Sequence, residues 1–351
     1  MTVITAPYEI NTDDVFVDLK SVFDVPLFLK YEGLNLAGSV KLKAALEMVL
    51  AAERDGTLTP GDVLVESSSG NLGVALSMIA ANRGYGFVCV TDSRCNPASR
   101  RLMEAFGARV LVISRPDKER GLLGARIDYV QRLVDFDPNY VWLNQYVNPH
   151  NWLAHYRSTA PAVAAQFPRL DVLFVGAGTT GTLMGCARYF RERQHPVRIV
   201  AVDSVGSVTF GGPALTRHIP GLGAGVRPAL LDDGLVDEVV MVPERDTLES
   251  CHAMARQGFL FGGSTGTVVS GALRWLAGRP RGERLTAVAL SPDQGDRYLD
   301  SLYDPAWVEQ HFGAPHTWDA ALPTAAGAAA GAGAGTGTGA AERPQLVTSA
   351  G

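Results

Sequence analysis

The chain has 351 residues, of which 46% are hydrophobic, so it can bury the core of one large domain or of two ordinary ones. Its 36 acidic residues outnumber its 31 basic residues, and the net charge of −5 argues against a nucleic acid or an anionic membrane as a partner held by bulk charge. No segment reaches transmembrane length or resembles a signal peptide, so we expect a cytoplasmic protein.

The cysteines have no paired spacing and no zinc-like spacing with histidine; they are Cys89, Cys95, Cys186 and Cys251. We therefore expect free thiols in a reducing compartment and no metal site. Three histidines also lack ligand spacing and are interpreted as loop or surface residues, namely His150, His155 and His218.

Apolar strand-like segments alternate with helix-like segments from about residue 40 to about residue 290. The first predicted series is helix 40–53, strand 62–66, helix 72–83, strand 87–91, helix 97–106, strand 109–113, helix 122–134 and strand 140–143. The second series is helix 153–166, strand 172–175, helix 182–193, strands 198–202 and 238–242, helices 247–257 and 266–277, and strand 285–290. Because the strands are continuous apolar runs, they predict an α/β fold with parallel sheets covered by helices on both faces.

The composition also predicts how the chain is divided. Residues 1–35 form an N-terminal arm and part of the large domain, residues 36–150 a smaller domain, and residues 151–318 the larger domain. The glycine- and proline-rich segment 204–227 is predicted to be a long functional loop. Residues 319–351 are rich in Ala, Gly and Thr and are predicted to be a disordered tail.

Lys41 lies at the predicted start of the first helix, where Ser39 is a candidate cap. The positive end of the helix dipole disfavours an ammonium ion, and a neutral amine is what a Schiff base requires. A solvated surface lysine is the ordinary alternative.

Three loops that precede predicted helices have the composition of ligand-binding loops. The first, Glu66 to Gly73, offers hydroxyls and backbone N–H groups to a carboxylate or phosphate at a helix start; an ordinary capped helix, with Ser69 or Asn71 as the cap, is the alternative. The second, Val175 to Thr182, combines glycines with three threonines and is typical of a phosphate site. The third, Gly262 to Gly266, could bond a heterocycle nitrogen or simply cap a helix through Ser264.

The second loop also matches the dinucleotide-binding pattern, because Asp203 ends the next strand at the position of a ribose-binding acid. A nicotinamide-dependent oxidoreductase is therefore one alternative function.

Together with Lys41, the three loops resemble the fold-type II pyridoxal-phosphate enzymes, the family of cysteine synthase and cystathionine β-synthase. The resemblance implies two doubly wound open sheets, similar to the tryptophan synthase β fold, with pyridoxal 5'-phosphate as cofactor, amino-acid substrates and a homodimer. Lys41 would bind the cofactor covalently and act in catalysis. The other implied cofactor contacts are Asn71 to the phenolic oxygen, Ser264 to the pyridine nitrogen, and Gly178, Thr179, Thr180, Gly181 and Thr182 to the phosphate. The implied substrate contacts are Ser68, Ser69 and Gly70 to the carboxylate, and Arg126 and Tyr146 to the donor.

Within this family, residues 20 to about 310 are similar to the N-(2-amino-2-carboxyethyl)-L-glutamate synthases, through segments 66–73, 144–156, 200–208, 220–223, 262–266 and 292–300. That resemblance implies β-replacement on O-phospho-L-serine or O-acetyl-L-serine with an amine, L-glutamate above all, for 2,3-diaminopropionate, siderophore or antibiotic biosynthesis. A cysteine synthase that uses sulfide is the nearest alternative.

Three positions depart from the pattern. Leu42 and Lys43 stand where the relatives usually carry Asp and Arg, and Gly178 stands where the siderophore synthase has a serine that helps bind phosphoserine.

Overall fold

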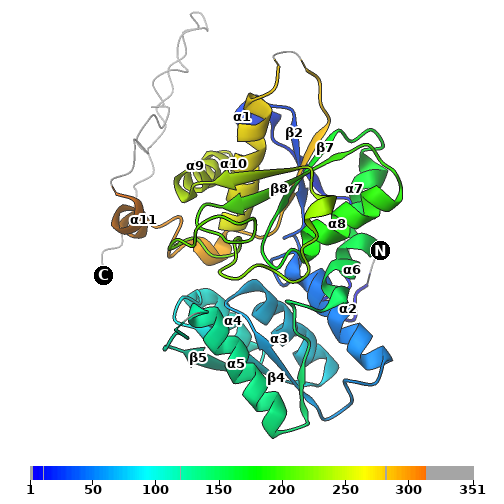
Figure 1. Ribbon diagram of the computed structural model, residues 1–351, viewed down its shortest axis with the longest axis vertical. Helices are drawn as coiled ribbons and strands as arrows, with labels where there is room; N and C mark the ends of the chain where they lie inside the picture. The colour runs from blue at the N-terminus through cyan, green and yellow to red at the C-terminus, as the bar shows by residue number, and fades with distance from the viewer. Residues whose placement is uncertain (1–2, 11, 119, 281–282, 314–351) are drawn as a thin grey trace, which may run out of the picture. The chain divides into compact units, whose positions relative to one another are not determined.

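Two sheets organise the chain in the computed structural model, which describes residues 3–10, 12–118, 120–280 and 283–313 (Figure 1). The smaller sheet has strands β3 (Val63–Ser67), β4 (Gly86–Asp92), β5 (Arg109–Ile113) and β6 (Tyr140–Trp142) in the order β5-β4-β3-β6, all parallel. The helices of this part are α2 (Lys41–Arg54), α3 (Asn71–Arg83), α4 (Pro97–Ala105) and α5 (Gly121–Phe136).

Alternate residues of the smaller sheet's strands pack on opposite faces. Phe87 and Cys89 belong to the core that contains residues of α2, α3 and α4, whereas Val88 and Val90 pack with Val130 of α5. Because both faces are covered, consecutive residues in the middle of these strands are apolar, as in Val63–Val65 of β3 and Phe87–Val90 of β4.

The larger sheet has six strands, in the order β1-β2-β10-β7-β8-β9. They are β1 (Phe16–Asp18), β2 (Leu27–Tyr31), β7 (Val172–Gly176), β8 (Arg198–Ser204), β9 (Glu238–Val242) and β10 (Ala287–Ser291), and β1 alone is antiparallel to its neighbour. Its helices are α6 (Pro149–Arg157), α7 (Thr159–Gln166), α8 (Gly181–Glu192), α9 (Glu244–Arg256) and α10 (Gly263–Ala277).

The same alternation divides the larger core. Val172 and Phe174 of β7 pack in the cluster that contains α9 and α10, and Leu173 and Val175 pack in the cluster that contains α7 and α8. The predicted fold class, α/β with two doubly wound open sheets, is confirmed.

Three parts of the chain differ from the sequence predictions. The N-terminal arm contains α1 (Lys20–Phe23) and contributes β2 to the interior of the larger sheet. The single helix expected over 153–166 is two helices, because the ring of Pro161 cannot follow the carbonyl of Arg157 in a continuous helix. Helix α11 (Pro305–Phe312) and the short 3-10 helices η1 (Asp233–Leu235) and η2 (Asp296–Tyr298) were not predicted.

The long loop is present: residues 205–232, all of them described, contain no helix or strand. The four cysteines are free, and Cys95 alone of them is not buried. No described helix combines the length and apolar composition of a membrane span. The domain limits at residues 35, 150 and 318 stay predictions, and the predicted tail lies outside the described residues.

Candidate active site

A cavity of about 410 Å³ lies where loops from the carboxyl ends of strands in both sheets meet. Eight of the predicted site residues line it: Lys41, Ser68, Ser69, Gly70, Asn71, Tyr146, Gly178 and Thr179. A smaller cavity of about 30 Å³ is lined by Thr180, Gly181 and Thr182. Lys41, Asn71, Gly178 and Thr179 line both cavities, so the lysine stands where the two meet.

Lys41 is the first residue of α2 and is half-buried. Burial lowers the pKa of its ammonium to about 8, although the negative charge of Asp293 acts in the opposite direction. At pH 7 about a tenth of the amine is therefore neutral, far more than for a lysine of ordinary pKa. The expected cap at Ser39 is wrong, because α2 has no side-chain cap and the buried hydroxyl of Ser39 has no hydrogen-bond partner.

The loop between β3 and α3 is held by Ser68, whose Oγ accepts hydrogen bonds from the backbone N–H of Gly73 (2.9 Å) and of Gly70 (3.3 Å). Helix α3 begins at Asn71 without a side-chain cap, so the ordinary cap by Ser69 or Asn71 is absent.

Asn71 is tied instead to the segment after β10. Its amide donates to Oδ2 of Asp293 (3.4 Å) and accepts from Nη1 of Arg297 (2.8 Å). The side chain predicted to touch the cofactor thus links the segments that follow β3 and β10, which belong to different sheets.

The threonine loop has an unusual backbone at Thr180, whose φ is 68°. A β-branched residue rarely adopts the left-handed region, and such outliers gather at functional sites. Gly181 follows as the first residue of α8, against which the side chain of Asn151 packs. The amide of Asn151 donates to the backbone oxygen of Gln145 (2.7 Å) and to Oγ1 of Thr179 (3.1 Å). These hydrogen bonds connect the threonine loop to the segment before α6.

Ser264 lies in the first turn of α10, which begins at Gly263 and has no side-chain cap, so capping by Ser264 is not observed. Ser264 is buried and lines neither cavity itself, but a Cβ on Gly221, which lines both, would overlap its Oγ. Gly221 has a φ of 116° and leaves the hydroxyl room at the cavity wall.

The two predicted donor contacts are placed differently. Tyr146 lines the large cavity, and its hydroxyl donates to the backbone oxygen of Ser67 (3.2 Å). Arg126 is buried behind the wall, with its Nε 3.3 Å from Oδ2 of Asp92. Its Nε and Nη1 have no hydrogen-bond partner.

Three arginines that the sequence reading missed line the large cavity: Arg120, Arg227 and Arg297. Arg120 could have been found from helical spacing, because it shares its face of α5 with Leu123, Gly124 and Ile127, at i, i+3, i+4 and i+7. Arg126 lies off that face.

The burial of Glu66 and of His155 was not predicted from the sequence. The fully buried Glu66 accepts hydrogen bonds from Nε1 of Trp142 (3.0 Å) and from the backbone N–H of Gln145 (3.2 Å), and burial raises the pKa of its carboxyl to about 7. The expectation that His155 lies in a loop or at the surface is wrong, since it is buried within α6.

Asp203 is fully buried at the end of β8, and its Oδ1 accepts from the backbone N–H of Ser204 (2.8 Å). It lines neither cavity, so the acid required by the dinucleotide alternative does not face the candidate site.

Comparison with known proteins identifies relatives over most of the chain. The family model described as pyridoxal-phosphate dependent enzyme matches residues 16–292. The N-(2-amino-2-carboxyethyl)-L-glutamate synthase of Cupriavidus metallidurans is 38% identical over 319 residues, which is 88% of this chain and 93% of the relative. The enzyme of the same name from Ralstonia nicotianae is 38% identical over 297 residues, covering 83% of this chain and 87% of the relative.

Two solved structures share the fold. O-ureido-L-serine synthase superposes with a TM-score of 0.79 and 31% identity, covering 88% of this chain and 99% of that one. The O-acetylserine-dependent cystathionine β-synthase of Helicobacter pylori superposes with a TM-score of 0.78 and 26% identity, covering 86% and 99%. This chain therefore belongs to the family of pyridoxal-phosphate-dependent enzymes.

Proposed function

We propose that the protein replaces the β-substituent of an activated L-serine, O-acetyl-L-serine or O-phospho-L-serine, with the amine of L-glutamate. The Cβ–O bond of the donor breaks and releases acetate or phosphate, a C–N bond forms at the same carbon, and the product is N-(2-amino-2-carboxyethyl)-L-glutamate. Both bacterial relatives carry the name of this synthase.

The observation that carries the proposal is the position of Lys41, a partly buried amine that borders both cavities. The larger cavity has room for an aromatic ring and an amino acid, and the smaller one lies at the N-terminus of α8, where backbone N–H groups and threonine hydroxyls suit a phosphate. The residues present thus fit pyridoxal phosphate, with Lys41 as its covalent partner, Thr179 to Thr182 around its phosphate and Ser264 near its ring. When bound, this cofactor withdraws electrons from the Cα of an attached amino acid.

The residues of the chain then have separable roles in the reaction. Lys41 takes the proton from Cα of the donor and returns one after the new bond has formed, which requires a neutral amine. The loop from Ser68 to Asn71 binds the donor carboxylate with its hydroxyls and N–H groups at the start of α3. Tyr146 extends this wall of the cavity.

The large cavity supports an amino acid rather than sulfide as the acceptor. With either acceptor the cavity of about 410 Å³ must also hold the cofactor ring and the donor, so its lining bears on the choice more than its volume does. Guanidinium groups match carboxylates in geometry, and glutamate brings two carboxylates to a cavity lined by Arg120, Arg227 and Arg297.

A product assay tests the proposal. The purified enzyme is incubated with each serine donor against glutamate, ornithine and sulfide, and the products are identified by mass. We expect the glutamate adduct to dominate; cysteine as the main product would refute the acceptor assignment and support the sulfide alternative.

A second test addresses Lys41 directly. The Lys41→Ala variant should bind the cofactor without the yellow absorption of a lysine-bound form and should form no product. A variant that keeps both the colour and the turnover would overturn the role of Lys41. The homodimer and the cytoplasmic location predicted above belong to the same proposal, and size-exclusion chromatography with light scattering tests the former.

A further inference from the structure

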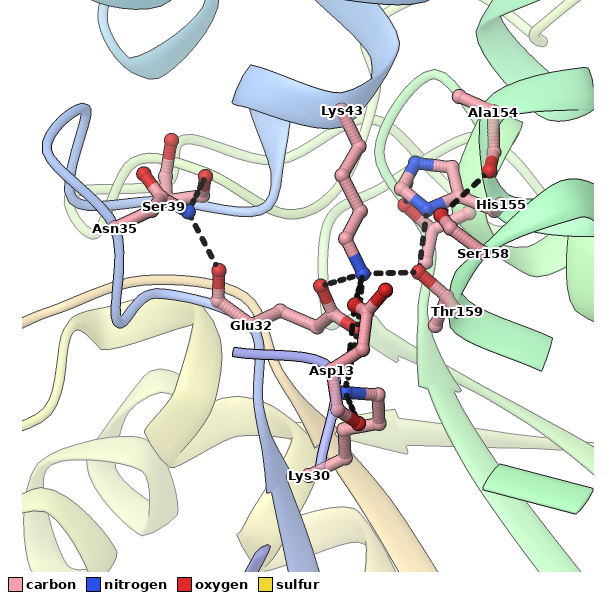
Figure 2. A network of polar contacts seen from close by, with 11 residues as sticks. Asp13, Lys30, Glu32, Asn35, Ser39, Lys43, Ala154, His155, Ser158 and Thr159 are labelled. Atoms are coloured by element: carbon pink, nitrogen blue, oxygen red, sulfur yellow. Dashed lines mark hydrogen bonds and ion pairs between the residues drawn. The ribbon is translucent and has the colours of Figure 1, made fainter. Parts of the chain in front are cut away.

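A partly buried cluster of charges lies beside the first turn of α2, and Lys43 is at its centre (Figure 2). The Lys43 ammonium donates to Oδ1 of Asp13, to Oε1 of Glu32 (3.1 Å) and to Oγ1 of Thr159 (3.3 Å). An ammonium has three hydrogens, and here three groups accept them. Lys43 is one of the three positions named above as departures from the pattern of the relatives.

The contacts continue from Thr159 to the threonine loop. Oγ1 of Thr159 lies 3.0 Å from Nδ1 of His155, and Nε2 of the same ring lies 3.2 Å from Oγ1 of Thr182. His155 is buried in α6, and Thr182 lines the small cavity beside Lys41. A line of hydrogen bonds therefore joins the charge cluster to the proposed phosphate site.

The chemistry of the first member favours one direction for the whole line, because Thr159 gives an acceptor lone pair to Lys43 and keeps its own hydrogen to donate. A lysine ammonium can only donate, so Thr159 accepts from Lys43 and its own hydrogen is available to His155. Nδ1 then accepts, and a neutral imidazole must carry its proton on Nε2. That proton is donated to Thr182, whose hydroxyl hydrogen is left to point elsewhere.

We infer that Lys43, Thr159 and His155 are positioning residues that hold the Thr182 hydroxyl as a hydrogen-bond donor toward the cofactor phosphate. The inference rests on the phosphate-binding role proposed for residues 178–182. It adds a reason why a cation is needed at position 43, which touches neither cavity beside Lys41.

The charge states required by this line persist over a wide pH range. Burial lowers the pKa of the His155 imidazole to about 3, so the ring is neutral at working pH. Burial also acts to lower the pKa of Lys43, but the carboxylates of Glu32 and Asp13 outweigh it and raise that pKa. The Glu32 carboxyl has its pKa lowered to about 2, because Lys43 and Lys30 together outweigh the effect of burial.

The first test reads the tautomer in the protein without cofactor. Nitrogen-15 NMR of the histidine-labelled apoprotein should show His155 with an unprotonated Nδ1 and a protonated Nε2. The opposite tautomer would overturn the inference, irrespective of the cofactor affinities of the variants described next.

The second test compares the affinities of the apoprotein for pyridoxal phosphate and for pyridoxal, which lacks the phosphate. Lys43→Met and Thr159→Val should each raise the dissociation constant of pyridoxal phosphate about tenfold, the value of one well-placed hydrogen bond to a charged group. The dissociation constant of pyridoxal should not change. Thr159→Ser keeps the hydroxyl and is the matched control, which should stay within about twofold of the wild type, since its hydrogen bonds are retained.

Equal losses for pyridoxal and pyridoxal phosphate would mean that the variants act through general structure, and the inference would fail. Thr182→Val separates this failure from failure of the phosphate site itself. If Thr182→Val weakens pyridoxal phosphate alone while Thr159→Val does not, the phosphate site stands and the positioning role of Thr159 is refuted. If Thr182→Val also has no selective effect, the phosphate does not bind at Thr182 and both are refuted.

Discussion

Replacing Gly181 with alanine places a methyl group against the side chain that anchors the threonine loop. The added Cβ would overlap Oδ1 of Asn151 and would lie 2.5 Å from its Cγ and 3.0 Å from its Nδ2. Asn151 cannot turn aside freely, because its amide donates to Gln145 (2.7 Å) and Thr179 (3.1 Å). Moving it therefore breaks two hydrogen bonds.

The cost can be assembled from these contacts. Two hydrogen bonds contribute about 1 kcal/mol each, and the overlap adds about 1–3 kcal/mol. Alanine at a helix position returns less than about 1 kcal/mol. We expect Gly181→Ala to lower the free energy of unfolding by about 3 kcal/mol, and to weaken pyridoxal phosphate as well because Thr179 loses its support.

Urea unfolding and cofactor titration measure both effects. Gly178→Ala is the matched control in the same loop, since its Cβ would meet only the backbone oxygen of Gly221, at 3.2 Å. Asn151→Ala should relieve the overlap, so that the double variant Gly181→Ala/Asn151→Ala is destabilised by about 1–3 kcal/mol less than the sum of the single variants. Equal stability of the two glycine variants, or strict additivity in the double variant, would refute this account of the loop.

Three further predictions follow from the site and the charge cluster. Because the pKa of Lys41 is lowered to about 8, the rate at which apoprotein forms its yellow complex with pyridoxal phosphate should rise with pH and level off above about 8; a rise that continues to pH 10 would contradict the lowered pKa. Lys30→Met should lower the free energy of unfolding by about 3 kcal/mol in urea, because the fully buried ammonium of Lys30 is 3.2 Å from Oε1 of Glu32, and a loss below about 1 kcal/mol would show that Lys43 alone suffices. Gly178→Ser should raise the ratio of kcat/KM for O-phosphoserine over O-acetylserine about tenfold, through one added hydrogen bond to the leaving group, and an unchanged ratio would exclude position 178 from donor selection.

The positions of the candidate lysine and of the candidate binding loops along the chain could be predicted from the sequence, because the patterns that indicate them are local. A lysine at a helix start, and loops of glycine and hydroxyl residues after apolar strands, depend on neighbours a few positions away. Strands covered on both faces leave an unbroken apolar run, so the parallel sheets were visible as well.

Strand β2 was not predicted, because its local sequence does not show why a charged residue should be buried in it. It is short and contains Lys30, whose burial makes sense only once the carboxylate of Glu32 and the backbone oxygen of Asp13 are beside it. A charge inside a sheet is acceptable when its partners are present, and those partners are set by folding.

The polar contacts of the site also depended on folding, because they join residues from different segments. Asn71 meets Asp293 and Arg297 from a distant part of the chain, and His155, which was expected in a loop or at the surface, lies between Thr159 and Thr182. Sequence spacing states which face of its own element a side chain occupies, but the groups opposite that face come from other segments, which for Asn71 lie 222 and 226 residues away. The amino-acid order alone therefore sufficed for most strands and helices of the two sheets, because their patterns are local. The packing of distant segments chose the hydrogen-bond partners, the buried charges and the arginines that face the cavity.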